Sequence, residues 1–383
     1  MPRHGGRVGR GIDEIPDRST KAFWHAPIML KGAELAHAYF DEAVQPVLRR
    51  EMPSLDYVAA RLGSGSDVLR LDDEISRDHD FGSRLTILVQ EGDAEVVAPL
   101  SAALESSLPE VFRGWPVRFA TSWDGSVSHK VDVGTISSFV TSRLGTDVSG
   151  DLGILDWLCL TGQSVLEVTG GPVFHDSTTE FTDLVRRLEW YPHDLWLYVL
   201  SSAWARLSQE MPFVGRTGQK GDTVGSRVIA ARLARDTMHL AFLLERRWAP
   251  YPKWMGTVLA ELPTGPVLTA RLEEALAAPD WQTRQTALSA AIECLAERQA
   301  ALGLPSASPA VEPFFNRPFR TTNGAIPTAL RDGMSDPEVR RLPLGLGSIE
   351  QWCDNVDFLS WPQRRVAAKE LFVRLVQAGD ASE

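Results

Sequence analysis

Two spacings of apolar positions recur in the first 142 residues, one typical of helices and one typical of strands. Residues 33–52 place apolar side chains such as Leu35 and Tyr39 at helical spacing, and Pro46 is expected to bend or end this helix. Short apolar runs that contain β-branched residues predict strands at 57–62, 85–89, 117–121 and 130–136, with another helix at 94–107. This mixture predicts a compact α/β unit over about residues 30–142.

The second half of the chain carries long helical patterns instead. They cover residues 180–210 and 225–248, and two more helices rich in alanine and leucine are predicted within 267–302. Residues 303–313 are rich in proline and predict a loop inside this helical part.

The length of the chain favours more than one domain. At 383 residues it is longer than one ordinary hydrophobic core supports, so two domains are expected. We predict an α+β fold with an extended or disordered segment at 1–27, a mixed sheet with helices at 28–165 and an all-α domain at 166–383.

The composition points to a soluble cytoplasmic protein. Hydrophobic residues make up 44% and charged residues 23% of the chain, and no apolar run approaches the roughly 20 residues that span a bilayer. The basic N-terminus is not followed by an apolar segment, so it does not read as a secretory signal. Cys159, Cys294 and Cys353 are far apart and lack metal-ligand spacing, which predicts free thiols in a reducing compartment.

The net charge of −11 argues against a polyanionic partner. A polyanion would be repelled on average, so we do not expect sequence-independent binding of DNA or RNA. A neutral or cationic small molecule is compatible with this charge.

Residues 61–82 concentrate acidic side chains beside two Gly-Ser pairs. Asp78 and Asp80 are two positions apart, and both carboxylates project from one face if they lead into the strand predicted at 85–89. Two carboxylates so close repel each other unless a cation lies between them, and Mg²⁺ with oxygen ligands fits this role. The alternative is an ordinary solvated surface loop.

Gly65-Ser66 follows the strand predicted at 57–62 and suits a phosphate group. Glycine lets the backbone approach a phosphate closely, and successive N–H groups with the serine hydroxyl can hold its oxygens. Gly63-Ser64 is a rival for the same role, and the spacing to the aspartates favours Gly65-Ser66.

A Gly-Ser pair, a spacer of about a dozen residues and Asp-x-Asp leading into a strand resemble the signature of the nucleotidyltransferase superfamily, which has the DNA polymerase β-like fold. That superfamily has a third carboxylate on a later strand, and Asp132 in KVDVG matches it. The resemblance implies that three aspartates are both catalytic residues and metal ligands: Asp78, Asp80 and Asp132. It implies nucleotide binding by Gly65, Ser66 and Asp67. Arg77 and His79 depart from the small or aliphatic residues that the superfamily more often has beside its aspartates.

Longer strings resemble one bacterial domain-of-unknown-function family over nearly the whole chain from about residue 28. They are GSGSDVLRLDDEISRDHD, RRLEWYPHDLW, GDTVGSRVIAARLARDTMHLAFLLERRWAPYPKW, NRPF and GSIEQWCDNVD. Members of that family pair an N-terminal nucleotidyltransferase-like domain with a helical C-terminal domain. The resemblance therefore implies that residues 28–165 form the nucleotidyltransferase-like domain.

The resemblance also implies a reaction. A nucleoside monophosphate, AMP from ATP or the equivalent from another nucleoside triphosphate, would be transferred to a hydroxyl of a small acceptor with release of pyrophosphate. Two Mg²⁺ ions, with Mn²⁺ as a substitute, would assist, and the acceptor would lie between the domains. A cationic acceptor would suit the acidic chain. The alternatives are a nucleotide sensor without turnover, and transfer to a protein or a tRNA.

Two lysines in the helical part are candidates for contact with the triphosphate. Lys253 lies in APYPKW after a long helix, and Lys220 lies in a loop before a helix, where a helix N-terminus can meet an anion. An ordinary surface lysine is the alternative for each. His239 lies on an apolar helix face and is expected to be a core histidine with satisfied hydrogen bonds.

Overall fold

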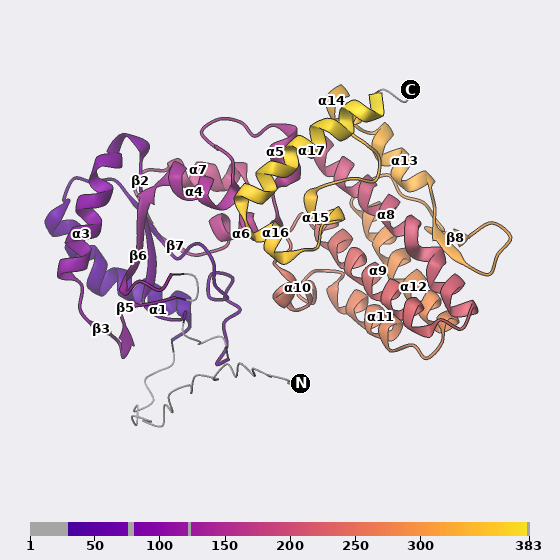
Figure 1. The fold of residues 1–383 in the computed structure, drawn as a ribbon, viewed down its shortest axis with the longest axis horizontal. Helices are drawn as coiled ribbons and strands as arrows, with labels where there is room; N and C mark the ends of the chain where they lie inside the picture. Colours follow the sequence, from indigo (N-terminus) through magenta and orange to yellow (C-terminus); the bar gives the residue numbers. More distant parts are fainter. Residues whose placement is uncertain (1–29, 76–79, 122–123, 381–383) are drawn as a thin grey trace, which may run out of the picture.

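The computed structural model describes residues 30–75, 80–121 and 124–380. Within these ranges the chain forms two lobes, a sheet flanked by helices and a larger group of helices (Figure 1). The predicted α+β fold class is confirmed.

The first lobe is built on a five-stranded sheet with the order β5-β6-β2-β1-β7 among the described residues. Its strands are β1 Val58–Ala60, β2 Arg84–Val89, β5 Arg118–Phe119, β6 Ser128–Thr135 and β7 Val173–Asp176. Strands β2 and β6 run parallel, whereas the other neighbouring pairs run antiparallel. A separate ribbon joins β3 Val111–Phe112 to β4 Trp115–Pro116. Because β7 pairs with β1, the sheet includes a segment beyond residue 165, where the helical domain was expected to begin.

The two faces of the sheet are buried by different helices, as the alternation of side chains along each strand requires. Ala59, Ile87 and Val131 belong to the core on one face, and Ala60 and Leu88 to the core on the other. The first face is covered by α1 Gly32–Tyr39, the π-helical turn η1 Phe40–Val44, α2 Gln45–Glu51, the 3₁₀ turn η2 Glu91–Val96 and α3 Val97–Ser107. The second is covered by α4 Ile136–Leu144 and α6 Gly162–Thr169.

The helix predicted at 33–52 forms, but it is interrupted by the π-helical turn η1 immediately before Pro46. Proline lacks the N–H that an α-helix needs at this point, and its ring collides with the preceding turn. A wider turn accommodates both effects, so the chain continues as α2.

The second lobe is organised around two long antiparallel helices, α8 His193–Gln219 and α9 Thr223–Leu244. The tight turn between them is capped by Asp222, whose side chain accepts a hydrogen bond from the backbone N–H of Gly225 at 2.7 Å. Fully buried Trp204 donates from its indole nitrogen to the Gln299 side chain at 2.7 Å, which fixes α8 against α12. The second lobe also contains α10 Pro252–Leu259, α11 Gly265–Ala277, α12 Trp281–Ala301, α13 Ala325–Asp332 and α14 Pro337–Arg340. Two short helices precede α8 in the chain, α5 Ile154–Cys159 and α7 Glu180–Arg187.

The predicted loop at 303–313 ends in a strand instead. Val311–Pro313 (β8) pairs with Arg320–Thr322 (β9) in a small hairpin inside the helical lobe. Each strand has three residues, which is too short for a pattern of alternation to show in the sequence.

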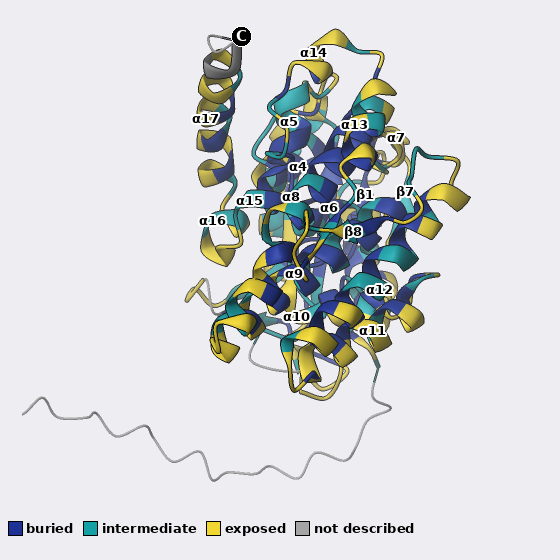
Figure 2. Ribbon diagram, turned by 90° about the vertical axis from the view of Figure 1, so that its right-hand side faces the viewer, coloured by how far each residue is buried: buried dark blue, intermediate teal, exposed yellow. Residues whose placement is uncertain are grey.

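The C-terminal segment returns to the junction of the lobes, where α15 Ile349–Trp352, α16 Val356–Ser360 and α17 Pro362–Asp380 lie (yellow in Figure 1). Helix α17 packs against α4 and α5 of the first lobe. Figure 2 shows it along one side of the molecule, with a buried stripe between exposed turns. Lys369 of α17 forms an ion pair with Asp156 of α5, so the end of the chain ties the lobes together.

Two expectations about the chain as a whole can be compared with the described part. None of its helices has the length and apolar character needed to span a membrane. The three cysteines are free thiols, as their spacing predicted.

Candidate functional site

Three neighbouring interior strands, β1, β2 and β6, carry the described part of the predicted site. β1 ends at Ala60, which lies opposite Thr86 of β2, and Thr86 lies opposite Asp132 of β6. Residues opposite each other in a sheet point to the same face, and neighbouring strands are about 4.8 Å apart. Asp132 is therefore two strands, roughly 10 Å, from the point where the Gly-Ser loop leaves β1.

A cavity of about 330 Å³ opens beside Asp132. Its described lining comes from the Gly-Ser loop, β2, β6, the segment before β6 and α4: Ser64, Arg84, Leu88, Thr121, Asp124, Lys130, Asp132, Val133, Gly134, Ser138, Phe139, Ser142 and Arg143. Arg84, Lys130 and Arg143 thus bring three cationic side chains to the same cavity as Asp132.

The cations of this cavity influence one another. Burial, and then the guanidinium group of Arg61, lower the pKa of Arg84 to about 10, and Arg143 adds to the decrease while Asp67 and Asp132 oppose it. Arg84 still carries its charge at neutral pH. Several positive charges held close together attract a multiply charged anion such as a triphosphate.

The Gly-Ser loop is shaped by Arg61, which is only 2% exposed. Its guanidinium donates to both carboxylate oxygens of Asp67, at 2.7 and 2.9 Å, and to the backbone carbonyl of Ser64 at 3.0 Å. Gly65 has a φ of +139°, and a Cβ there would lie 2.2 Å from an Asp67 oxygen, so only glycine fits. Asp67 therefore holds the loop through Arg61.

Of the two Gly-Ser pairs, Gly63-Ser64 is the one whose serine lines the cavity. Gly63 has a φ of +82°, and its N–H donates to the backbone carbonyl of Glu167 in α6 at 2.8 Å. These observations favour the rival pair that the sequence offered. The assignment of Gly65 and Ser66 to phosphate stays a prediction.

The predicted aspartate triad is not tested by the structure, because Asp78 lies outside the described residues, as do Arg77 and His79. Asp80 lies in the turn that leads to β2 and is half-buried. Asp132 lines the cavity and is exposed, so its charge carries little desolvation cost. Among the described residues, no three carboxylate, histidine or cysteine side chains are grouped as a metal site. The triad stays a prediction.

The two predicted lysines lie elsewhere. Lys220 is exposed at the C-terminal end of α8, about 40 Å along that helix from His193. Lys253 is exposed in the first turn of α10, with its ammonium group 4.8 Å from the centre of the Trp254 ring. Neither is among the described residues that line the cavity beside Asp132.

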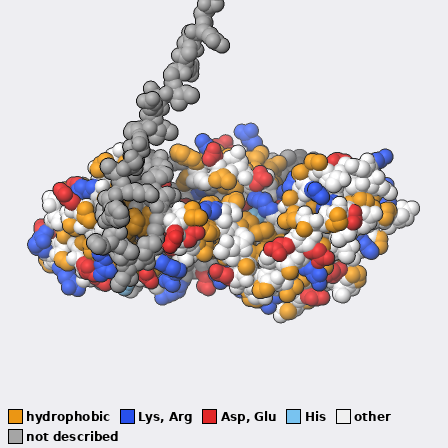
Figure 3. Space-filling view, turned by 90° about the horizontal axis from the view of Figure 1, so that it is seen from below, with side chains coloured by type: hydrophobic (Ala, Val, Ile, Leu, Met, Phe, Trp, Pro, Cys, Tyr) orange, Lys and Arg blue, Asp and Glu red, His pale blue; other side chains and the backbone are white. Residues whose placement is uncertain are grey.

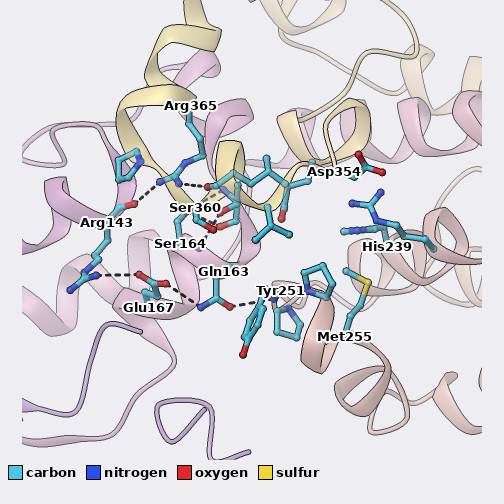
Figure 4. A pocket seen from close by; sticks show the side chains of 18 of the residues that line it. Arg143, Gln163, Ser164, Glu167, His239, Tyr251, Met255, Asp354, Ser360 and Arg365 are labelled. Carbon is cyan, nitrogen blue, oxygen red and sulfur yellow. Dashed lines mark hydrogen bonds and ion pairs between the residues drawn. The ribbon is translucent and has the colours of Figure 1, made fainter. Parts of the chain in front are cut away.

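A second, smaller cavity of about 130 Å³ lies between the lobes, where an acceptor site was expected, although the sequence did not indicate the residues that line it (Figure 4). Its lining from the first lobe includes Ser142, Arg143, Thr161, Gln163, Ser164 and Glu167. The helical lobe and the C-terminal segment add Arg235, His239, Pro250, Tyr251, Pro252, Met255, Glu350, Asp354, Val356, Leu359, Ser360, Pro362 and Arg365. Ser142 and Arg143 line both cavities, so the two adjoin across α4.

A chain of polar contacts crosses the junction at this second cavity (Figure 4). Arg143 lies 3.5 Å from a carboxylate oxygen of Glu167, whose other oxygen accepts from the Gln163 side chain at 3.2 Å. Gln163 in turn accepts from the backbone N–H of Tyr251 at 3.3 Å. The chain connects α4 and α6 of the first lobe to the segment that precedes α10.

Two ionisable groups of the interdomain cavity have strongly shifted pKa values. Burial raises the pKa of Glu350 to about 7, against the hydrogen bond from the Gly162 N–H at 2.9 Å and the charges of Arg235 and Arg365. Burial, together with the charges of Arg235 and Arg206, lowers the pKa of His239 to about 3, so its ring is neutral at physiological pH. Nε2 of His239 is buried and has no hydrogen-bond partner among the residues that the structure describes, which corrects the expectation of a satisfied core histidine.

Comparison with known proteins gives a family match in this region. Residues 157–255 match the family described as Domain of unknown function (DUF4037). The predicted resemblance to a domain-of-unknown-function family is confirmed for this segment, which runs from α5 to α10 and contributes much of the interdomain cavity.

Solved structures and curated protein sequences provide two further comparisons. Among solved structures, a nucleotidyltransferase-like protein from Exiguobacterium sibiricum 255-15 is similar, with 13% sequence identity and a TM-score of 0.32. The similarity covers 69% of this chain and 77% of that one. No curated protein sequence matches the chain.

The sequence carried signals for some residues that were not predicted. Lys130 precedes Asp132 by two positions in one strand, and Arg84 precedes Thr86 in the same way, so period-two spacing places each pair on one face. Arg143, Glu167 and Glu350 come together only through packing of distant helices, which no local pattern reveals.

Proposed function

We propose that this protein is a metal-dependent nucleotidyltransferase that transfers AMP from ATP to a hydroxyl group of a small molecule and releases pyrophosphate. The observation that carries the proposal is the position of Asp132, which shares a cavity with Arg84, Lys130 and Arg143 beside the end of a Gly-Ser loop. This chemistry requires a carboxylate that binds a hard metal ion and several positively charged side chains that bind the triphosphate.

The cationic side chains would hold the nucleotide. Arg84 and Arg143 present planar guanidinium groups suited to phosphate oxygens, and Lys130 adds a point charge. The hydroxyl of Ser64 and the loop backbone would contact the phosphates from the other side of the cavity. Together these groups orient the triphosphate and balance its charge.

The donor set fits a divalent cation. Asp132 is an exposed carboxylate in the cavity, Asp80 precedes the neighbouring strand, and carboxylate oxygens are the ligands that Mg²⁺ prefers. Asp80 and Asp132, with Asp78, would hold Mg²⁺ or Mn²⁺. When bound, the metal would neutralise phosphate charge and lower the pKa of the acceptor hydroxyl.

In the proposed reaction, the oxygen of the acceptor hydroxyl forms a bond to the α-phosphorus of ATP. The bond from that phosphorus to the oxygen bridging the α- and β-phosphates breaks, and pyrophosphate leaves with the electron pair. The hydroxyl proton passes to a base in the cleft. Positioning by Arg84, Lys130 and Arg143 supplies much of the rate enhancement, because little other covalent chemistry is required.

The test uses the full chain with Mg²⁺, each nucleoside triphosphate and pools of small-molecule metabolites. We expect pyrophosphate release that depends on an acceptor pool, and a product heavier than its precursor by one AMP group in the mass spectrum. Tight nucleotide binding without pyrophosphate release in every pool would contradict the proposal and would instead support a nucleotide sensor.

The distribution of charge on the surface bears on whether the acceptor is a small molecule or a nucleic acid. On the face shown in Figure 3, acidic and basic side chains are intermixed, with no continuous basic band on the part drawn in colour. This arrangement supports a small-molecule acceptor over a nucleic acid, in line with the net charge of −11.

A further inference from the structure

The cavity between the lobes has the features of a built ligand site, and it adjoins the proposed nucleotide cavity. We infer that it binds the acceptor, and that this acceptor is an uncharged polyhydroxylated molecule of about monosaccharide size. The inference rests on the proposed function, because a molecule bound here is an acceptor only if the protein transfers a nucleoside monophosphate to it.

Unpaired polar atoms in the cavity walls are the first observation. Nε2 of His239, Nε of Arg143 and Nε of Arg365 are all buried without a hydrogen-bond partner in the described structure. A buried polar atom without a partner destabilises the protein, so three such atoms around one cavity point to a polar occupant. A neutral histidine ring can donate or accept, and a hydroxyl group complements it in either case.

The charges of the lining side chains indicate that the occupant is uncharged. Arg143 pairs with Glu167, and the opposite charges of Arg235 and Glu350 influence each other. Arg365 donates to the backbone carbonyls of Leu359 and Arg143, and Asp354 lies exposed at the rim. Arg143 and Arg235 each lie within 4 Å of a carboxylate, Glu167 and Asp236 respectively, and the exposed Asp354 adds a negative charge. Glu350 is partly protonated near neutral pH and His239 is neutral, so the lining as a whole carries little net charge. A charged ligand would disturb this balance of charges, and the cost of removing water from its charge would oppose binding.

Hydrogen-bonding capacity in the walls suits hydroxyl groups in particular. Ser142 donates its proton to the backbone carbonyl of Phe139 at 2.6 Å, so its oxygen remains as an acceptor at the cavity. Ser164 also lines the cavity, but its hydroxyl donates to the Thr161 carbonyl at 2.9 Å and accepts from the Thr161 N–H at 3.1 Å. Because the pKa of Glu350 is about 7, its carboxyl group both donates and accepts hydrogen bonds near neutral pH. A molecule with several hydroxyl groups can use the oxygens of both Ser142 and Glu350.

Part of the cavity lining is apolar. Tyr251, Met255 and Leu359 line the same cavity, and their side chains offer a surface for the C–H face of a saturated ring. A cavity of about 130 Å³ accommodates one small ring and excludes a multi-ring molecule from its interior. A monosaccharide or a cyclitol combines an apolar face with a polar edge.

The position of the cavity makes transfer possible. Ser142 and Arg143 lie on α4 between the two cavities and line both of them. Gly63 of the loop beside the proposed phosphate position donates to the backbone of Glu167, which lines the interdomain cavity. A hydroxyl of a ligand in this cavity therefore lies next to the site proposed for the triphosphate.

Calorimetric titration without nucleotide tests the inference, with glucose, myo-inositol, glucosamine and glucuronate as probes for the full chain. We expect a neutral polyol to bind more tightly than the amine or the acid of similar shape. Leu359→Trp, which fills the cavity from a half-buried wall, should abolish binding, and His239→Phe should weaken it roughly tenfold by removing a hydrogen bond. Asp124→Asn, in the other cavity, is the matched control and should bind the polyol normally.

The outcomes separate this inference from the proposed function. Stronger binding of the amine or the acid, or polyol binding that survives Leu359→Trp in a folded protein, would overturn the assignment of the cavity. No polyol binding in a chain that binds ATP and releases pyrophosphate with another acceptor would also overturn it, while leaving the proposed function intact. Polyol binding without any nucleotidyl transfer would contradict the proposed function and would support only a ligand site in this cavity.

Discussion

Arg365, in the last helix of the chain, donates a hydrogen bond from its guanidinium group to the backbone carbonyl of Arg143 in α4. It is 1% exposed and donates to the Leu359 carbonyl as well. One side chain thus joins the C-terminal segment to the helix that separates the two cavities. The relationship explains why α17 is held on the first lobe although it follows the helical lobe in sequence.

Removal of this contact should loosen the junction. Arg365→Ala leaves two buried carbonyls without donors and an empty volume, so we expect the free energy of unfolding to fall by about 2–4 kcal/mol. Urea denaturation measures the loss, and hydrogen exchange should show faster exchange in α17. Arg364→Ala on the same helix is the control, because Arg364 is exposed, and its variant should stay within about 0.5 kcal/mol of the wild type. Equal effects of the two substitutions would contradict the role of Arg365.

The buried pair of Arg61 and Asp67 should be the main support of the Gly-Ser loop. Arg61→Met leaves the Asp67 carboxylate, which is 13% exposed, without its partner and should cost about 3–5 kcal/mol of stability. Arg113→Met breaks a surface pair with Glu42 and should cost less than about 1 kcal/mol. Thermal unfolding compares the two variants, and a small loss in Arg61→Met would show that the loop does not depend on this pair.

Local patterns in the sequence predicted the parts of the fold that depend on local physics. The strand at 85–89 and the helix at 225–248 were found because their apolar spacing has a clear period and each is long enough to show it. β7 was missed because its four residues, VFHD, carry little periodicity and are placed by pairing with β1, more than 100 residues earlier.

For the candidate site as well, local motifs in the sequence indicated some residues and could not indicate others. Asp132 was predicted from a motif with fixed neighbours; the structure places it on the interior strand β6, where it lines a cavity, and its role as a metal ligand stays a prediction. The lining of the interdomain cavity was not predicted, although an acceptor site between the domains was expected, because Glu167, Glu350 and Arg365 converge from three different helices. Lys220 was chosen from a loop before a helix, a local feature that does not reveal its position at the end of α8.

The assignment of Lys130 to the nucleotide can be separated from that of the other lysines. Lys130→Met should weaken ATP binding roughly tenfold, because a charge-assisted hydrogen bond contributes about 1.5–3 kcal/mol before compensation by its neighbours. Lys220→Met, in an exposed turn away from the cavity, should leave the affinity unchanged. Calorimetric titration with ATP and Mg²⁺ measures both, and a larger loss in Lys220→Met would reverse the assignment.

The stability of the protein should depend on the ionisation of Glu350. Its pKa is about 7 in the folded protein, above the ordinary value of 4.5, so the folded state keeps a proton that the unfolded chain releases between these values. The free energy of unfolding should therefore fall as the pH rises through this window. Glu350→Gln removes the titration, and its stability relative to the wild type should increase from about pH 5 to about pH 8.

Urea denaturation of both proteins across this pH range provides the measurement. His239 is also titratable in the same cavity, but it is present in both proteins and its effect cancels in the difference. Stability curves that stay parallel at every pH would show that Glu350 does not titrate in this window.

The most direct test of the account compares two carboxylates of the same cavity. Asp124 is exposed and pairs with Lys130 at 3.6 Å, whereas Asp132 lies on the strand proposed to hold the metal. We predict that Asp132→Asn abolishes acceptor-dependent pyrophosphate release while ATP still binds, and that Asp124→Asn retains release within about threefold of the wild type, in line with the modest contribution of a surface ion pair. Wild-type rates in a folded Asp132→Asn variant would contradict the proposal that this aspartate is part of a nucleotidyl transfer site.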